Sequence, residues 1–151
     1  MMFRIRDDNT IILTQGNSAI INVIPYIDDE SEPIVLSTDE KIYFTIKSPS
    51  GRVYMQKVLT LNDYDEENNL NLIFKPEDTI NLEVYDYLYD MLYVNKDGDA
   101  YTFIESVPIF STDKMCKLKC ICNPKSTKYK KSYAATFRVV EAISKKDWSE
   151  N

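Results

Sequence analysis

The feature that most constrains the fold is an alternation of apolar and polar residues with a period of two. It is clearest in the run KIYFTIKS at residues 41–48, where Ile42, Phe44 and Ile46 fall on one face. Successive side chains of a strand point to opposite sides, so this pattern is typical of a half-buried antiparallel strand. We find no apolar stripe with helical spacing over ten or more residues. The chain is therefore predicted to be all-β.

Further runs of β-branched and aromatic residues recur along the chain, with turn residues between them. We expect strands at residues 10–15, 18–24, 41–48, 52–61, 70–74, 85–94, 100–104 and 136–143, with a single helical turn at 76–79. Asp97-Gly98 between two aromatic-rich runs is the strongest hairpin signal, whereas Pro25 is expected to end the second strand. Residues 107–110 and 117–122 are expected to form a protruding hairpin. Many short strands separated by turns are typical of a sandwich.

A chain of 151 residues can bury a core of its own, so we expect a single β-sandwich domain over residues 1–151. Residues 105–135 are interpreted as an insertion that contains lysines and cysteines, and residues 145–151 as a polar C-terminal tail. The first residues lack the apolar stretch of a signal peptide, and no run reaches the length of a membrane span. We therefore expect no membrane association and synthesis in a cytoplasm.

Composition argues against most enzyme chemistry. The chain has no histidine, which removes the commonest general base and the commonest metal ligand. Its three glycines, Gly16, Gly51 and Gly98, lie too far apart for a glycine-rich phosphate loop. The acidic run from Asp63 fails the calcium-loop pattern, because its sixth position is Asn68 rather than glycine. We expect no catalytic residues, no cofactor and no enzyme activity.

Three cysteines lie within seven residues, at Cys116, Cys120 and Cys122. An odd number at this spacing does not resemble the disulfide framework of a secreted domain, so we expect reduced thiols. Thiolates bind zinc or copper(I), but a tetrahedral zinc site needs a fourth donor that no histidine can supply. The three cysteines are therefore weak metal candidates, and small apolar residues in a hairpin are the favoured interpretation.

Charge is segregated along the chain. Residues 1–113 carry 8 basic and 21 acidic side chains, whereas residues 114–138 carry 8 basic and none acidic. The net charge of −6 is opposite to the usual footprint of a nucleic-acid-binding protein. We expect the basic block to contact an acidic protein surface, such as another copy of this chain, rather than nucleic acid. The candidate interface residues are Lys114, Lys117, Lys119, Lys125, Lys128, Lys130, Lys131, Tyr129, Tyr133 and Trp148.

The chain has eleven tyrosines, of which four lie close together at Tyr85, Tyr87, Tyr89 and Tyr93. Tyrosine is common in protein interfaces, and exposed aromatic rings also bind sugars. In a sandwich, some of these rings would instead pack in the core with their hydroxyl groups at its rim. Core packing and a protein interface are equal alternatives for these tyrosines, and sugar binding is a weaker one.

Several motifs occur in an order that points to a family. They are RIR at residues 4–6, TIILTQGNSA at 10–19, DEKIYFTIK at 39–47, KPEDT at 75–79, YLYDM at 87–91, DGDAYT at 97–102 and FRVVEAIS at 137–144. Together they resemble the N-terminal domain family of phage upper baseplate proteins, over residues 3–104 and again over about 136–144. The family usually has aspartate where Asn17 stands, and it has a short closing segment where this chain has residues 105–135.

The resemblance implies an Ig-like antiparallel β-sandwich, for which we expect seven to nine strands and an inserted basic loop or hairpin. It also implies a non-enzymatic structural virion protein, a phage tail or baseplate adaptor that attaches or positions receptor-binding or other tail components. Its partners would be other virion proteins and copies of itself. Its location would be the virion, after assembly in the host cytoplasm. The resemblance carries over no catalytic residues.

Three alternatives stay open. The first is a capsid decoration or head-fibre protein, which differs from the adaptor in its location in the particle. The second is a carbohydrate-binding module that recognises a host surface glycan, for which exposed coplanar aromatic rings would be needed. The third is a small metal-responsive or nucleic-acid-binding protein that uses the Cys/Lys segment, for which bound zinc or salt-sensitive DNA binding is expected.

Overall fold

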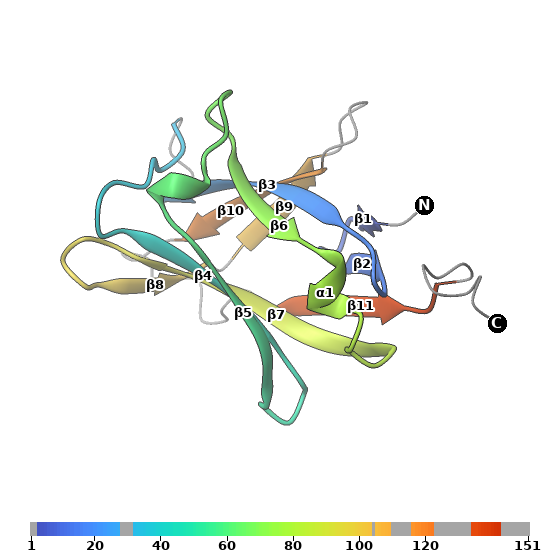
Figure 1. Ribbon diagram of the computed structural model, residues 1–151. Coiled ribbons are helices and arrows are strands. Elements are labelled where there is room, and N and C mark those ends of the chain that lie inside the picture. Colours follow the sequence, from blue (N-terminus) through green and yellow to red (C-terminus); the bar gives the residue numbers. More distant parts are fainter. Residues whose placement is uncertain (1–2, 28–31, 104, 110–115, 123–133, 143–151) are drawn as a thin grey trace.

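The computed structural model describes residues 3–27, 32–103, 105–109, 116–122 and 134–142, and these residues are mostly β (Figure 1). Within these ranges there are eleven strands, β1 (Phe3–Ile5), β2 (Ile11–Thr14), β3 (Ala19–Ile27), β4 (Lys41–Lys47), β5 (Val53–Leu59), β6 (Leu70–Phe74), β7 (Tyr85–Val94), β8 (Ala100–Thr102), β9 (Glu105–Ile109), β10 (Cys116–Cys122) and β11 (Ala135–Val140). A short 3-10 helix, η1 (Leu61–Asp63), follows β5. The helical turn expected at residues 76–79 is confirmed as α1 (Pro76–Thr79).

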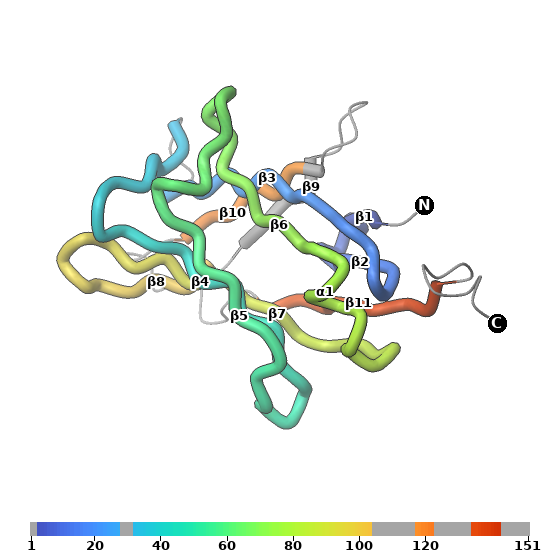
Figure 2. The backbone as a smooth tube through the Cα atoms, in the orientation of Figure 1, coloured from blue at the N-terminus to red at the C-terminus, as the bar shows by residue number. Residues whose placement is uncertain are grey.

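The strands form two sheets, one on each side of a common core (Figure 2). The larger sheet has the order β1-β2-β11-β7-β4-β5, with β8 paired to β7, and the smaller sheet has the order β6-β3-β10-β9. The predicted all-β sandwich is confirmed. Two pairs, β11 with β2 and β10 with β3, are parallel, so the sheets are mixed rather than purely antiparallel as expected.

The core is built from the residues that the alternation identifies. Ile42, Phe44 and Ile46 of β4 are fully buried, as predicted. The Phe44 ring meets the Phe74 ring of β6 edge-on, with 5.7 Å between the ring centroids, so aromatic side chains of the two sheets pack together. Burying a large apolar side chain contributes about 1.5–3 kcal/mol to the free energy of unfolding, so the apolar side chains packed between the two sheets are the main source of stability.

Strand β3 runs through Pro25 to Ile27 instead of ending before the proline. The reason is that β6 pairs with β3 only as far as Val23, so no neighbouring strand on that side needs the N–H group that Pro25 lacks. Beyond the end of β6, the Pro25 carbonyl accepts a hydrogen bond from Ile34 N at 2.7 Å. A proline is therefore tolerated at this position of the strand.

The hairpin expected to protrude is instead part of the smaller sheet. β10 lies parallel to β3, and β9 pairs with β10 at the sheet edge. β10 can join the sheet because Leu118, Cys120 and Cys122 present a buried apolar face to the core. These two strands, together with the short strand β1, raise the number of strands in the described residues to eleven, against the seven to nine expected.

The β2–β3 turn is anchored to α1. Gly16 has a positive φ of 77°, and its N–H group donates a hydrogen bond to Thr79 Oγ1 at 2.9 Å. A Cβ atom on Gly16 would lie 2.8 Å from Ile80 Cδ1, so no larger residue fits without a shift. From the other side, Lys57 Nζ lies 2.6 Å from Asp78 Oδ2. These contacts hold α1 against the end of the core.

Candidate interaction sites

Most of the predicted interface residues lie outside the described part of the chain. These are Lys114, Lys125, Lys128, Lys130, Lys131, Tyr129, Tyr133 and Trp148. Lys117 and Lys119 are described, and both lie on β10 with half-buried side chains. Lys119 Nζ lies 4.7 Å from the centroid of the Tyr26 ring on β3, a cation–π contact. The two lysines therefore belong to the outer face of the smaller sheet.

A chain of polar side chains crosses the same face. Asp65 Oδ2 accepts a hydrogen bond from Asn71 Nδ2 at 3.1 Å, and Asn71 Oδ1 accepts one from Asn22 Nδ2. The carboxylate fixes the direction of both amides, so Asn22 Oδ1 is buried without a partner among the described residues. A slip of one residue along β3 would turn Asn22 toward the core, so this chain disfavours other registers of the sheet.

Cys120 and Cys122 have buried side chains on β10, and Cys116 begins the same strand. Cys120 Sγ lies 3.7 Å from Met91 Sδ of β7, across the core. Burial raises the pKa of both thiols, that of Cys122 to about 11, so both are protonated at neutral pH. A neutral buried thiol is a poor metal ligand and packs as a small apolar residue. Among the side chains that the structure describes, no three metal-binding groups gather in one place.

The loop carboxylates bind backbone and hydroxyl groups. Asp65 Oδ1 accepts a hydrogen bond from Asn69 N, and Glu40 Oε2 accepts one from Tyr93 Oη at 2.6 Å. The Asn69 hydrogen bond lowers the pKa of Asp65. Burial would raise the pKa of Glu40, but the bonds from Tyr93 and Ser37 outweigh it and lower the value. Both groups are held ionised, which suits the capping of turns rather than general acid catalysis.

The four tyrosines of β7 divide between the core and the surface. Tyr87, Tyr89 and Tyr93 are buried, whereas Tyr85 at the start of the strand is 49% exposed. All four side chains point to the face that meets the smaller sheet, because they alternate along one strand. Tyr85 is exposed because it lies beyond the part of this face that the smaller sheet covers. Core packing therefore accounts for three of these residues, and Tyr85 is the one available to a partner.

Tyr85 belongs to a cluster that the sequence did not reveal. Tyr54 of β5 and Tyr85 each pack against Tyr87, with ring centroids 5.1 Å and 5.2 Å from it. The Arg52 guanidinium carbon lies 5.1 Å from the centroid of the Tyr54 ring, which is 41% exposed. We refer to Arg52, Tyr54, Tyr85 and Tyr87 as the tyrosine–arginine cluster. The exposed rings of Tyr54 and Tyr85 both pack against the buried ring of Tyr87.

A β-bulge brings Tyr54 into the cluster. The pairing of β4 with β5 shifts between Ile46 and Lys47, and Tyr54 is the residue of β5 that the shift leaves without a partner. A bulge takes the extra side chain out of the regular alternation, so Tyr54 turns to the face on which Tyr87 lies. The only hint in the sequence is that residues 53–58 carry apolar side chains on both faces of the expected strand.

The cluster is fixed at its base by a buried ring. Tyr87 is only 3% exposed, and its hydroxyl donates a hydrogen bond to the Glu83 carbonyl at 3.1 Å. The Tyr54 and Tyr85 rings meet the Tyr87 ring at 63° and 70°, so they do not lie flat in one plane with it. A sugar platform needs coplanar exposed rings, and the edge-on packing seen here is common to aromatic side chains in general. Tyrosine and arginine side chains are also enriched among the residues that contribute most to protein interfaces.

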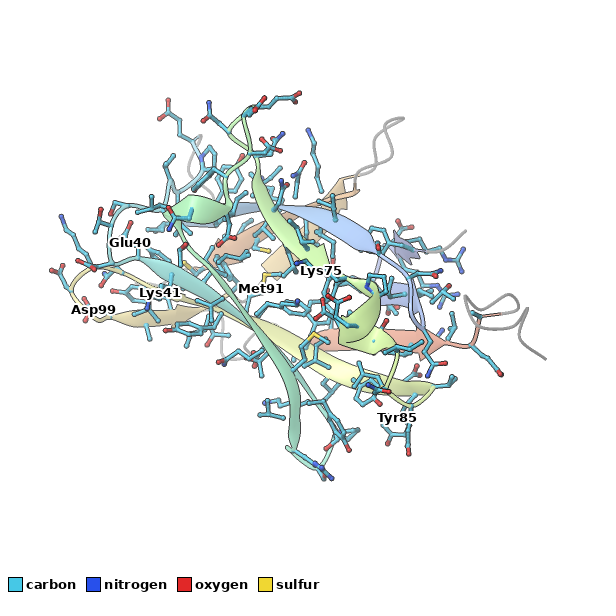
Figure 3. All side chains as sticks on the ribbon, in the orientation of Figure 1. Glu40, Lys41, Lys75, Tyr85, Met91 and Asp99 are labelled. Atoms are coloured by element: carbon cyan, nitrogen blue, oxygen red, sulfur yellow. The ribbon has the colours of Figure 1, made fainter. Side chains whose placement is uncertain are left out.

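The opposite end of the sandwich is acidic. The β3–β4, β5–β6 and β7–β8 connections meet there, because Lys41 pairs with Val94 and Ile42 pairs with Leu59. Figure 3 shows Glu40 and Asp99 at this end and Tyr85 at the other. The basic side chains at this end, among the described residues, are Lys41 at the start of β4 and Lys96 in the β7–β8 connection. The acidic side chains of the three connections are more numerous: Glu32, Asp39, Glu40, Asp63, Asp65, Glu66, Glu67, Asp97 and Asp99. We refer to this region as the acidic end.

Comparisons with known protein families, with curated proteins and with solved structures find no match to this chain. Within the described residues, no helix is long and apolar enough to cross a membrane. The candidate sites are therefore defined by geometry alone, as the tyrosine–arginine cluster at one end of β7 and the acidic end at the other.

Proposed function

We propose that this chain is a non-enzymatic structural protein of a virion, an adaptor of a phage tail or baseplate that positions other tail components. The observation that carries the proposal is the ordered set of motifs that resembles phage upper baseplate proteins, from RIR at residues 4–6 to FRVVEAIS at 137–144. The fold supports it, because β7 separates two chemically different ends by a fixed distance. An adaptor needs two such contact surfaces on one rigid body.

The carboxylates support a role without catalysis. Asp8, Glu40, Asp65 and Asp78 each have a pKa that is lowered in the folded chain, through the hydrogen bonds that they accept. A general acid at neutral pH would need a raised pKa. These four carboxylates accept hydrogen bonds that cap turns or hold α1, so their role is to stabilise the fold.

Three of the edge strands, β1, β9 and β5, favour partners that dock on the ends and faces of the sandwich. β1 has only three residues, and β9 contains Pro108, which cannot donate a ladder hydrogen bond. β5 carries both the bulge at Tyr54 and the charged Lys57, which points inward to Asp78. Each device hinders the addition of another strand. Assembly by side-chain contacts is therefore favoured over strand exchange.

The basic block of residues 114–138 provides a further contact in this proposal. Its charge complements the acidic surface of a neighbouring virion protein or of another copy. Reversing the charge of Lys128, Lys130 and Lys131 to glutamate is expected to impair assembly of the particle. If the variant assembles into particles as well as the unmodified chain does, these lysines make no such contact.

Mass spectrometry of gradient-purified particles from the native source tests the proposed function. We expect the chain to co-purify with the particles in a fixed ratio to their other tail proteins. The soluble fraction of the same lysate serves as the comparison. If the chain stays in that fraction and is missing from the particles, the structural role is wrong.

A further inference from the structure

We infer that copies of this chain associate head to tail, with the tyrosine–arginine cluster of one copy receiving the Asn95–Asp99 turn at the acidic end of the next. This inference rests on the proposed function and deepens it, because it assigns a second copy as the partner of one defined surface.

The receiving surface combines exposed apolar area with one unpaired cation. Tyr54 and Tyr85 are exposed, and the neighbouring Val53 and Val84 are 58% and 53% exposed. Arg52 stacks on Tyr54 and forms no ion pair within the described residues. Its guanidinium can therefore bind a carboxylate through two parallel N–H groups. Tyrosine and arginine, with tryptophan, are enriched among the residues that contribute most of the binding energy at protein interfaces.

The inserted turn presents two carboxylates on a fixed backbone. Asn95 Oδ1 accepts hydrogen bonds from Asp97 N and Asp99 N, both at 3.0 Å, and Gly98 supplies the positive φ of 86° that the turn needs. The side chains of Asp97 and Asp99 are exposed and make no hydrogen bond or ion pair within the described ranges. They differ in this from Glu40, whose carboxylate binds Tyr93 and Ser37.

The two surfaces lie at opposite ends of one strand. Tyr85 begins β7, and the Asn95–Asp99 turn follows Val94 at its end (Figure 3). One copy therefore cannot join its own surfaces, and a contact between them must be made with a neighbour. Such a head-to-tail contact generates a ring if the rotation closes and a filament if it does not. In a ring, a modest contact is repeated in every copy.

Two double variants test the contact separately. Arg52→Ala with Tyr54→Ala removes the receiving surface, and Asp97→Asn with Asp99→Asn removes the inserted carboxylates. In sedimentation velocity over a dilution series, we expect the unmodified chain to form assemblies and each variant to self-associate at least about tenfold more weakly. An equimolar mixture of the two variants retains one intact contact, so it should form a one-to-one dimer and nothing larger.

Matched controls separate this contact from general effects of charge. Arg4→Ala removes an exposed arginine from β1, and Glu66→Gln with Glu67→Gln removes two exposed carboxylates from the same acidic end. Both controls should associate like the unmodified chain. Circular dichroism identifies any variant that fails to fold, and Tyr85→Ala provides a second variant of the receiving surface.

The outcomes distinguish this contact from the proposed function. An unmodified chain that stays monomeric at every concentration, or a mixture of variants that fails to dimerise, overturns the head-to-tail contact. Either result leaves the virion role intact if the chain is found in purified particles. Absence from the particles overturns the virion role, whatever the chain does in solution.

Discussion

The Tyr54 and Tyr87 rings touch across β4, with their centroids 5.1 Å apart, although their strands are not neighbours in the sheet. Tyr87 is buried and Tyr54 is exposed, so this contact joins the core to the surface. The proposed contact surface depends on this difference in burial, because the buried Tyr87 ring supports the exposed rings. It can be tested by removing a buried ring and an exposed ring separately.

Tyr87→Ala should lower the free energy of unfolding by about 3 kcal/mol, because it leaves a cavity beneath two other rings. Tyr85→Ala should lower it by less than about 1 kcal/mol, because the Tyr85 ring is half exposed. Urea unfolding of the two variants measures both values. Equal losses would mean that Tyr85 belongs to the core and is not available to a partner.

Gly16→Ala should lower the free energy of unfolding by about 1–3 kcal/mol, because φ is 77° and the new Cβ would lie 2.8 Å from Ile80 Cδ1. In an Ile80→Ala background the clash with Ile80 Cδ1 is removed, and only the backbone strain from the positive φ contributes to the cost of Gly16→Ala. The cost of Gly16→Ala should then be smaller but not zero. A double-mutant cycle measures the coupling, and strictly additive costs would contradict the contact with Ile80.

Asp78→Asn should lower stability at neutral pH by about 1–2 kcal/mol, because Asp78 Oδ2 accepts bonds from Lys57 Nζ at 2.6 Å and Lys75 N at 2.7 Å. Burial would raise the pKa of Asp78, but the bonds from Lys57 and Lys75 outweigh it and lower the pKa. Its stabilising effect is therefore complete above the unfolded-state pKa of about 3.9, and it is lost as pH falls through the lower folded-state pKa.

The variant should consequently lose less stability than the unmodified chain when the pH is lowered below about 4. Thermal unfolding across this pH range gives the comparison. Glu77→Gln is the matched control, since Glu77 is the exposed neighbour of Asp78 on α1. An acid profile for Asp78→Asn that matches the unmodified chain would contradict the role of this carboxylate.

The thiols of Cys120 and Cys122 should resist a thiol reagent in the folded chain. Both are buried, and the pKa of Cys122 is raised to about 11, so few thiolates exist at about pH 8. In a Cys116→Ser background, both should react only as fast as the chain unfolds. Treatment with a zinc chelator should leave the unfolding temperature unchanged. Rapid labelling, or a lower unfolding temperature after chelation, would restore the metal-site alternative.

The sequence predicted those parts of the fold that depend on local patterns. The alternation of Ile42, Phe44 and Ile46 identified the inner face of β4, and the turn chemistry of Asp97-Gly98 identified the hairpin after β7. A period of two and a glycine with positive φ act within a few residues, so they can be recognised in one sequence. The residues of α1 were likewise predicted by a proline and acids at the start of a helical turn.

The parts that depend on pairing between distant strands were not predictable. β10 lies beside β3 in parallel, so its place in the sheet is set by a partner almost a hundred residues earlier in the chain. The contact of Tyr54 with Tyr87 requires both the bulge in β5 and the order β7-β4-β5. Neither the register nor the order is encoded by local composition, so the cluster could be found only in the structure.

Immunogold electron microscopy of purified particles tests the virion role most directly, because it reports both the presence and the position of the chain. Antibodies against the chain should label the distal end of the tail, which is the result that we expect. Labelling of the capsid would contradict the tail adaptor in favour of a decoration protein. Particles without any label, while the chain is found free in the cytoplasm, would contradict a structural role in the virion altogether.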